Sequence, residues 1–198
     1  MPFDHNDHYH RLLLDRLPPG GRTALDVGCG TGRFARALVA HGYRVDALDP
    51  DPATLAVAEA SGGGPRYHVA DAATADLPPG RYDVISCLAS LHHMPFETLT
   101  RFRDALAPGG RLLVLGCYAG LTPWDLVASP ANALTRLAVY AAERARGAAP
   151  PPPRPPVRAP EMTLPRIRAE STRLLPGSEV RQLLFWRYLL TYTAAADR

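Results

Sequence analysis

The sequence predicts an α/β fold in which helices cover both faces of a doubly wound, mostly parallel sheet. Between residues 22 and 117, short runs of β-forming residues alternate with amphipathic segments of helix length. Turn and capping residues separate the two kinds of segment. A glycine-rich stretch follows the first strand-like run, which is where parallel sheets bind their ligands. At 198 residues, the chain is expected to be one domain over 1–198.

Five strands and three helices account for this alternation. The strands are predicted at 23–27, 44–48, 66–69, 82–87 and 111–117. In the first helix Phe34 and Leu38 share one face, and His41-Gly42 ends the helix with a cation and a C′ glycine. Strands connected by such helices imply right-handed crossovers and a parallel sheet.

The other two helices have equally clear boundaries. Asp51-Pro52 begins the second helix as N-cap and first helical residue, and the run Ser-Gly-Gly-Gly at 61–64 ends it. In the third helix, apolar residues recur at helical spacing until the Pro-Gly-Gly run at 108–110 stops them. These residues are Phe96, Leu99, Phe102 and Leu106.

The sequence after residue 117 departs from the alternation. Helix starts are predicted at 122–125 and 129–130, and a proline tract at 150–156 is expected to be extended. A short helix is predicted at 164–174. The β-rich run at 180–193 is predicted to form an antiparallel C-terminal edge of the sheet and is long enough for two short strands.

Composition excludes several classes of protein. All 22 basic residues are arginine, so any mechanism that needs a lysine is excluded. The net charge of +3 is modest and the arginines are scattered, so we expect no nucleic-acid partner. No run is long enough to cross a membrane, and the first residues do not form a signal peptide, so we expect no membrane partner and a cytoplasmic location. Three isolated cysteines indicate neither a disulfide framework nor a zinc site.

The glycine-rich stretch, Leu-Asp-Val-Gly-Cys-Gly-Thr-Gly at 25–32, is typical of a backbone that lies close to a ligand. A dinucleotide pyrophosphate site would need a further glycine at the position of Arg33. A triphosphate-binding loop would need Gly-Lys followed by Ser or Thr, and the chain has no lysine. Both phosphate ligands are therefore disfavoured.

What remains is an acid followed by glycines two residues apart, which resembles the first motif of the class I S-adenosylmethionine-dependent methyltransferases, a Rossmann-like family. Further motifs follow in the family's order. Asp49 ends the second strand, Asp71 follows the third, and Leu-Ala-Pro-Gly-Gly-Arg at 106–111 leads into the fifth. The fourth strand and its loop, residues 82–94 ending in Ser-Leu-His-His-Met, look like the small-molecule branch of the family.

This resemblance implies S-adenosylmethionine as the cofactor. Asp26 and the glycine loop are expected beside its amino acid end, Asp49 on the ribose hydroxyls and Asp71 beside the adenine. A carboxylate that accepts two hydroxyl hydrogen bonds suits the ribose chemically. The complete predicted cofactor set is Tyr9, Asp26, Gly28, Cys29, Gly30, Asp49, Pro50, Asp71, Ala72, Cys87 and Leu88.

The resemblance also implies methyl transfer to a small-molecule acceptor, with His92 and His93 as candidate general bases. In the family, residues at the positions of Tyr9 and His10 precede the core and close over the cofactor. No metal site is predicted, because the spacing of the N-terminal histidines fits no defined site. Residues 119–160 are expected to form a lid or substrate-capping insertion, and the protein to be a monomer or homodimer.

Two alternatives remain open at this point. The first is a protein of this fold that binds S-adenosylmethionine without transferring its methyl group, either as a sensor or as an enzyme of different chemistry. The second is a nucleic-acid methyltransferase, which would bind RNA or DNA with a strong salt dependence. The sequence identifies neither the acceptor nor the atom that is methylated.

Overall fold

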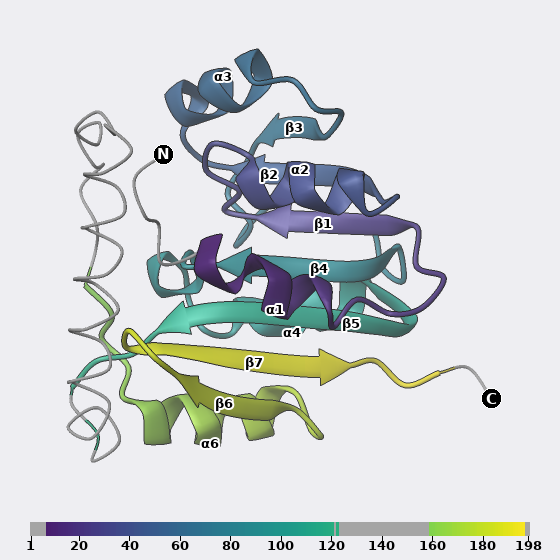
Figure 1. The fold of residues 1–198 in the computed structure, drawn as a ribbon. Coiled ribbons are helices and arrows are strands. Elements are labelled where there is room, and N and C mark those ends of the chain that lie inside the picture. The colour runs from purple at the N-terminus through teal and green to yellow at the C-terminus, as the bar shows by residue number, and fades with distance from the viewer. Residues whose placement is uncertain (1–6, 121, 123–158, 197–198) are drawn as a thin grey trace.

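The computed structural model describes residues 7–120, 122 and 159–196. Its strands form one seven-stranded sheet in the order β3-β2-β1-β4-β5-β7-β6 (Figure 1). The first five strands are parallel, β7 is antiparallel to β5, and β6 is antiparallel to β7. The predicted fold class is confirmed. The strands are β1 (Thr23–Val27), β2 (Arg44–Asp49), β3 (Arg66–Val69), β4 (Tyr82–Leu88), β5 (Leu106–Cys117), β6 (Glu179–Leu183) and β7 (Arg187–Thr193).

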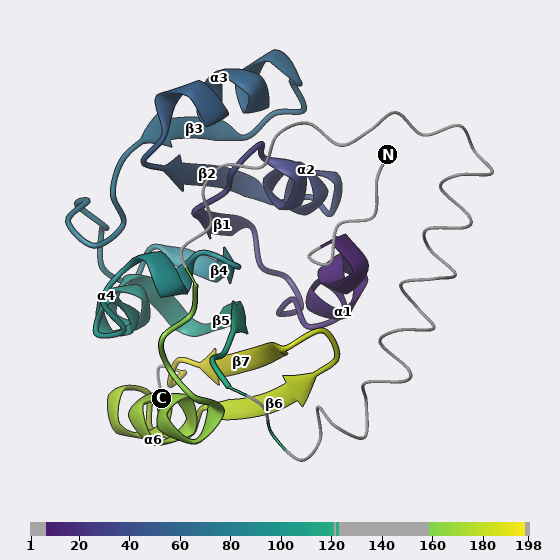
Figure 2. The ribbon, with the colours of Figure 1, turned by 90° about the vertical axis from the view of Figure 1, so that its left-hand side faces the viewer.

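Helices pack against both faces of the sheet, and each face has its own hydrophobic cluster. Helices α1 and α2 cover one face, and α4 and α6 cover the other (Figure 2). Alternate residues of β1 serve the two faces, with Ala24 in one cluster and Leu25 in the other. The helical elements are η1 (Asp7–Tyr9), α1 (His10–Leu14), α2 (Arg33–Ala40), α3 (Pro52–Ala60), η2 (Leu91–His93), α4 (Thr98–Ala105) and α6 (Leu164–Leu174).

The predicted helix boundaries around α2 and α3 are confirmed by their capping contacts. His41 is the C-cap of α2, its Nδ1 lies 2.8 Å from the Ala37 carbonyl, and Gly42 follows with a φ of 88°. The Asp51 carboxylate accepts a hydrogen bond of 3.1 Å from the Ala53 amide at the start of α3. Both ends follow from local sequence, because each cap lies within a few residues of the groups it satisfies.

The third helix and the fifth strand differ from the prediction. Helix α4 ends at Ala105, and β5 begins at Leu106 instead of at residue 111, because Leu106 already pairs with Tyr82 of β4. A Cβ on Gly110 would lie 2.9 Å from the Tyr82 carbonyl oxygen, so glycine is needed where the two strands approach. Strands β2 and β4 each extend one residue further than predicted.

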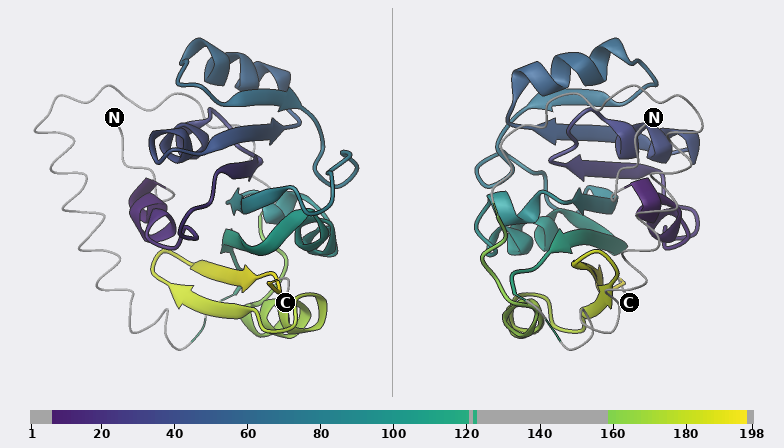
Figure 3. Two further views of the ribbon diagram at one scale, coloured as in Figure 1. Left: turned by 90° about the vertical axis from the view of Figure 1, so that its right-hand side faces the viewer. Right: turned by 60° about the vertical axis from the view of Figure 1, so that its left-hand side comes forward.

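The C-terminal edge is a hairpin, as the length of the β-rich run indicated. Helix α6 has the predicted bounds, and β6 and β7 are joined by a turn in which Phe185 and Trp186 have φ values of 61° and 55°. This hairpin forms one edge of the sheet, and β3 forms the other (Figure 3). The predicted helix start at 122–125, apart from residue 122, lies outside the described residues, as do the predicted helix start at 129–130 and the proline tract at 150–156.

Candidate functional site

The glycine loop lies at the carboxyl end of β1, where the backbone turns towards α2. Gly28, Gly30 and Gly32 have φ values of 63°, 55° and 74°, in the left-handed region that favours glycine. A Cβ on Gly28 would lie 2.3 Å from the Ser90 Cβ, and one on Gly32 would lie 2.2 Å from the Tyr67 hydroxyl oxygen. A Cβ on Gly30 would meet nothing within 4 Å. The loop therefore packs against Ser90 at Gly28 and against Tyr67 at Gly32, and Gly30 has open space for a ligand.

Asp49, the last residue of β2, is tied to this loop. One carboxylate oxygen, Oδ2, accepts a hydrogen bond of 2.9 Å from the Gly30 amide, and Oδ1 accepts one of 3.0 Å from the Asp51 amide. A carboxylate can accept about four hydrogen bonds, so each oxygen retains acceptor capacity for one ligand hydroxyl, two in all. Pro50 is exposed beside it.

Asp26, in β1, is buried, with 2% of its surface exposed. Its Oδ1 accepts a hydrogen bond of 2.6 Å from the Ser86 hydroxyl of β4, whereas Oδ2 has no hydrogen-bond partner among the described residues. Burial raises the pKa of Asp26 to about 7, although the hydrogen bond from Ser86 opposes that rise. An orphaned carboxylate oxygen behind a glycine loop fits a ligand that brings a cationic amino group.

Asp71 and Ala72 follow β3 and extend the same edge of the sheet. Asp71 is exposed, and its Oδ1 accepts a hydrogen bond of 2.9 Å from the Ala73 amide. Ala72 is buried in the core. The three acids of the predicted cofactor set thus lie at or near the carboxyl ends of the three adjacent strands β1, β2 and β3, which meet at one edge of the sheet because the strands are parallel.

Two residues of the predicted cofactor set have side chains buried in the hydrophobic clusters. The Tyr9 ring is buried in a core cluster and its hydroxyl donates to the Leu184 carbonyl at 3.0 Å, while burial raises its pKa to about 12. Cys87 is fully buried in the other cluster, and its thiol lies 3.0 Å from the Ser90 hydroxyl. Of Cys87 only the backbone is left for a ligand. Cys29 and Leu88 are half-buried.

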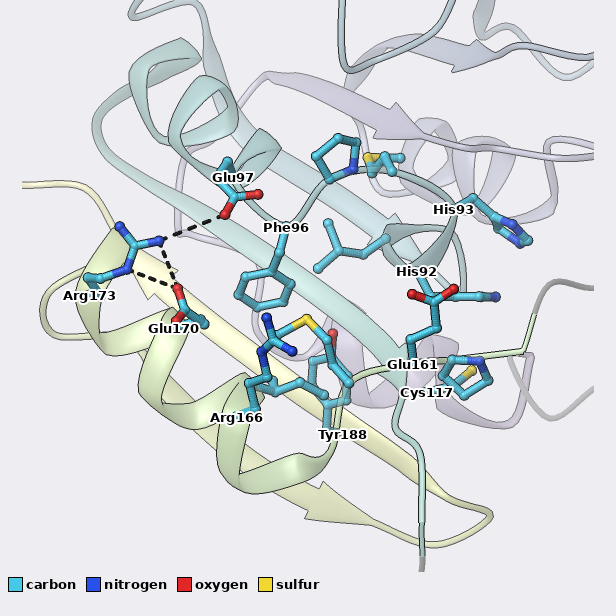
Figure 4. Close-up of a pocket in the computed structure, with 16 residues that line it drawn as sticks. His92, His93, Phe96, Glu97, Cys117, Glu161, Arg166, Glu170, Arg173 and Tyr188 are labelled. Atoms are coloured by element: carbon cyan, nitrogen blue, oxygen red, sulfur yellow. Dashed lines mark hydrogen bonds and ion pairs between the residues drawn. The ribbon is translucent and has the colours of Figure 1, made fainter.

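The two histidines lie together in η2, the single helical turn after β4. Their ring centroids are 4.1 Å apart, and both line a cavity of about 580 Å³ (Figure 4). His93 is exposed, whereas both ring nitrogens of His92 are enclosed by protein. His8 and His10 are elsewhere, against the rings of Tyr9 and Phe34 respectively.

Ser90 connects the histidine turn to the glycine loop. Its hydroxyl donates a hydrogen bond of 2.9 Å to the Val27 carbonyl at the end of β1. The same side chain fills the space that a Cβ on Gly28 would need. Ser86 and Ser90 were not predicted, because two serines in a strand and its loop give no signal until β4 is placed beside β1.

The rest of the cavity wall comes mainly from segments that the sequence did not assign to a site. Helix α6 contributes Arg166, Glu170 and Arg173, and β7 contributes Tyr188 (Figure 4). Burial raises the pKa of Tyr188 well above its usual range, so its hydroxyl keeps its proton. These residues carried no recognisable motif, and only the fold brings them opposite the histidines.

Gly28→Ala is expected to lower the free energy of unfolding by about 2–3 kcal/mol, measured by urea titration. The alanine would adopt a positive φ, which costs about 1–2 kcal/mol, and its Cβ would also displace Ser90. Gly30→Ala is the matched control, because it has the same backbone conformation and open space around the new Cβ. Equal destabilisation by the two variants would contradict the contact between Gly28 and Ser90.

Comparisons with known proteins agree on one family. The family described as "Methyltransferase domain" matches residues 25–114. An uncharacterised methyltransferase of Mycobacterium bovis is 32% identical over 98% of both chains. A ubiquinone biosynthesis O-methyltransferase of Xylella fastidiosa is 33% identical over 63% of this chain and 54% of its own.

Among solved structures, the magnesium protoporphyrin IX methyltransferase of Synechocystis with bound SAM has a similar fold. Its TM-score is 0.59 at 18% identity, with 96% of this chain and 77% of that chain covered. No helix among the described residues is long and apolar enough to span a membrane. The motif order, the sheet topology and the relatives lead to one conclusion. The chain belongs to the class I S-adenosylmethionine-dependent methyltransferases, enzymes whose methyl donor is S-adenosylmethionine.

Proposed function

We propose that this enzyme methylates a small molecule bound in the histidine-lined cavity. The observation that carries the proposal is the position of that cavity. Its wall begins at Leu91, directly after Ser90, and Ser90 contacts the glycine loop. A volume of about 580 Å³ is within the range of small-molecule sites, roughly 300–1,000 Å³. The relatives named for ubiquinone biosynthesis and magnesium protoporphyrin IX support an acceptor of this size class.

The residues of the glycine-loop site fit the cofactor. Asp26 would face its amino group, Asp49 its ribose hydroxyls and Asp71 its adenine, with the Gly30 backbone in close approach. When bound, S-adenosylmethionine supplies a methyl group on a sulfonium, which an acceptor nucleophile takes by in-line displacement to leave S-adenosylhomocysteine. The enzyme's main contribution is alignment, which can be worth about 7–11 kcal/mol.

A nucleophile that carries a proton also needs a base. We assign this role to His93, because its exposed ring can accept the acceptor's proton and return it to water. His92, whose ring lies 4.1 Å from that of His93 at a tilt of 39° and whose ring nitrogens are enclosed by protein, would support the orientation of His93. Neither histidine needs a metal for this chemistry.

The insertion over 119–160 belongs to the same proposal, as a lid of the single domain 1–198. Most of it lies outside the described residues, but its first residue is joined beside the cavity to the segment that follows its last residue. The Ala119 amide donates a hydrogen bond of 2.8 Å to the Met162 carbonyl, and Pro160 and Met162 line the cavity. We further propose that the enzyme acts in the cytoplasm as a monomer or homodimer.

Asp49→Ala is expected to weaken the binding of S-adenosylhomocysteine about 10–100-fold, because two ribose hydroxyls lose a charged acceptor worth ~1.5–3 kcal/mol. Isothermal titration calorimetry on the purified protein measures this. Asp51→Ala is the control, since Asp51 caps α3 next to the site and has no predicted cofactor contact. Unchanged affinity in Asp49→Ala would remove the proposed ribose contact and, with it, the assignment of this edge as the cofactor site.

A further inference from the structure

One cation of the cavity wall differs from its neighbours. Arg166 lies in the first turns of α6, and its guanidinium makes no hydrogen bond or ion pair with the other cavity residues (Figure 4). By comparison, the guanidinium of Arg173, two helical turns further on, forms ion pairs with two glutamates. Its Nη2 lies 2.7 Å from Glu170 Oε2 and 3.9 Å from Glu97 Oε1. The cavity therefore presents one guanidinium without a described partner.

Part of the wall around Arg166 is apolar. Phe96, Met162, Ile167 and Tyr188 line the same cavity, and Ile167 and Tyr188 are buried core residues. A ligand in this space gains most of its binding free energy from an apolar or aromatic part, because binding removes that surface from contact with water. The polar groups lie at different places on the wall, with Arg166 on α6 and the histidine pair on η2 (Figure 4).

Charge limits what Arg166 can bind. Besides the two arginines, the wall carries three carboxylates, those of Glu97, Glu161 and Glu170, and Glu97 and Glu170 share the single positive charge of Arg173. A dianionic phosphate would meet more negative than positive charge here. A single carboxylate matches the planar fork of one guanidinium and adds only one negative charge.

We propose that Arg166 selects a carboxylic acid as the acceptor: it pairs with the carboxylate of an apolar or aromatic molecule whose other end reaches the histidines. This inference rests on the proposed function, since it names the chemical class of the molecule that fills the cavity. Arg166 is a specificity residue in this scheme. It does not touch the reacting atoms.

The test uses three probes of one shape: 3-phenylpropanoate, 3-phenylpropanamide and 3-phenylpropylamine. Their dissociation constants are measured by ligand-observed NMR titration of the full chain, with and without saturating S-adenosylhomocysteine. The acid is expected to bind about tenfold more tightly than the amide, because an exposed arginine gains less than a buried one. In Arg166→Gln the affinity for the acid is expected to fall to the affinity for the amide. The affinity for the amide is expected to stay unchanged.

Arg168→Gln is the matched control, because Arg168 is exposed on the same helix and does not line the cavity. It is expected to leave the preference for the acid intact. Inorganic phosphate at 10-fold excess over the acid is expected not to displace it. The proposal is overturned if the acid binds no better than the amide or amine, if Arg166→Gln weakens acid and amide equally, or if phosphate competes.

The two proposals fail in different ways. Calorimetric titration with S-adenosylhomocysteine reports on the cofactor site, and Arg166→Gln is expected to leave that affinity within twofold of the wild type. Absence of cofactor binding by the wild type would overturn the proposed function. The ranking of the three probes by affinity tests the role of Arg166 separately. Circular dichroism of the variant confirms its fold, since Arg166 is a surface position of α6.

Discussion

His93→Ala is expected to reduce methyl transfer about 10²–10⁴-fold while leaving the affinity for S-adenosylhomocysteine unchanged. The reason is that His93 lines the cavity with an exposed ring, whereas the glycine loop and the three acids of the cofactor set belong to other segments. Transfer is measured with radiolabelled S-adenosylmethionine and an extract of small metabolites, followed by the identification of the labelled product. Calorimetry gives the cofactor affinity of the same preparations.

Chemical rescue distinguishes a base from a structural residue. Added imidazole is expected to restore part of the activity of His93→Ala, with a pH dependence that follows the ionisation of imidazole. His92→Ala is the matched control, because it removes the neighbouring ring, whose centroid is 4.1 Å away, and leaves His93 in place. Small and equal losses in both variants, with no rescue, would indicate that alignment alone carries the reaction.

Asp26→Asn is expected to stabilise the cofactor-free protein by up to about 4 kcal/mol at pH 8. Burial raises the pKa of Asp26 from 3.8 to about 7, so at pH 8 the folded protein holds an ionised carboxylate with one unpartnered oxygen. Asparagine removes the charge and keeps the oxygen that accepts from Ser86. Urea titrations of wild type and variant at several pH values measure the difference.

The sign of the pH dependence follows from the direction of that shift. Between about pH 4 and pH 7 the folded protein binds a proton at Asp26 that the unfolded chain has lost. Unfolding therefore releases a proton in this range, and the contribution of Asp26 to stability falls as the pH rises. Below about pH 4 Asp26 is protonated in both states, so the advantage of the asparagine variant is expected to vanish there.

Asp46→Asn is the matched control for this experiment. Asp46 is also a buried carboxylate in a strand of the sheet, with 8% of its surface exposed, but its Oδ1 lies 3.0 Å from the guanidinium of Arg66. Its neutralisation is expected to destabilise the protein. Asp26→Asn is also expected to weaken cofactor binding about tenfold, so that stability and function oppose each other at this position. A lower free energy of unfolding for Asp26→Asn than for the wild type at pH 8 would contradict this explanation of the Asp26 carboxylate.

Several features were predictable from the sequence because their causes are local. Helix α6 has the predicted bounds, and Asp51 caps α3 through groups two residues away. The position of the glycine loop after β1 was equally predictable, since the φ values it requires favour glycine itself. The start of β5 was missed because Leu106 joins the sheet through its pairing with Tyr82, a partner distant in sequence.

By itself, the sequence determined the order of strands and helices, the glycine loop and the acids at the ends of adjacent strands, which identify the family and its cofactor. Only the tertiary structure decided that Tyr9 and Cys87 pack in the core and that Ser90 locks the histidine turn to Gly28. It also placed Arg166 in the same cavity as His93. The physical reason is that periodicity and capping act over a few residues, whereas burial and charge pairing depend on which distant segments the sheet brings together.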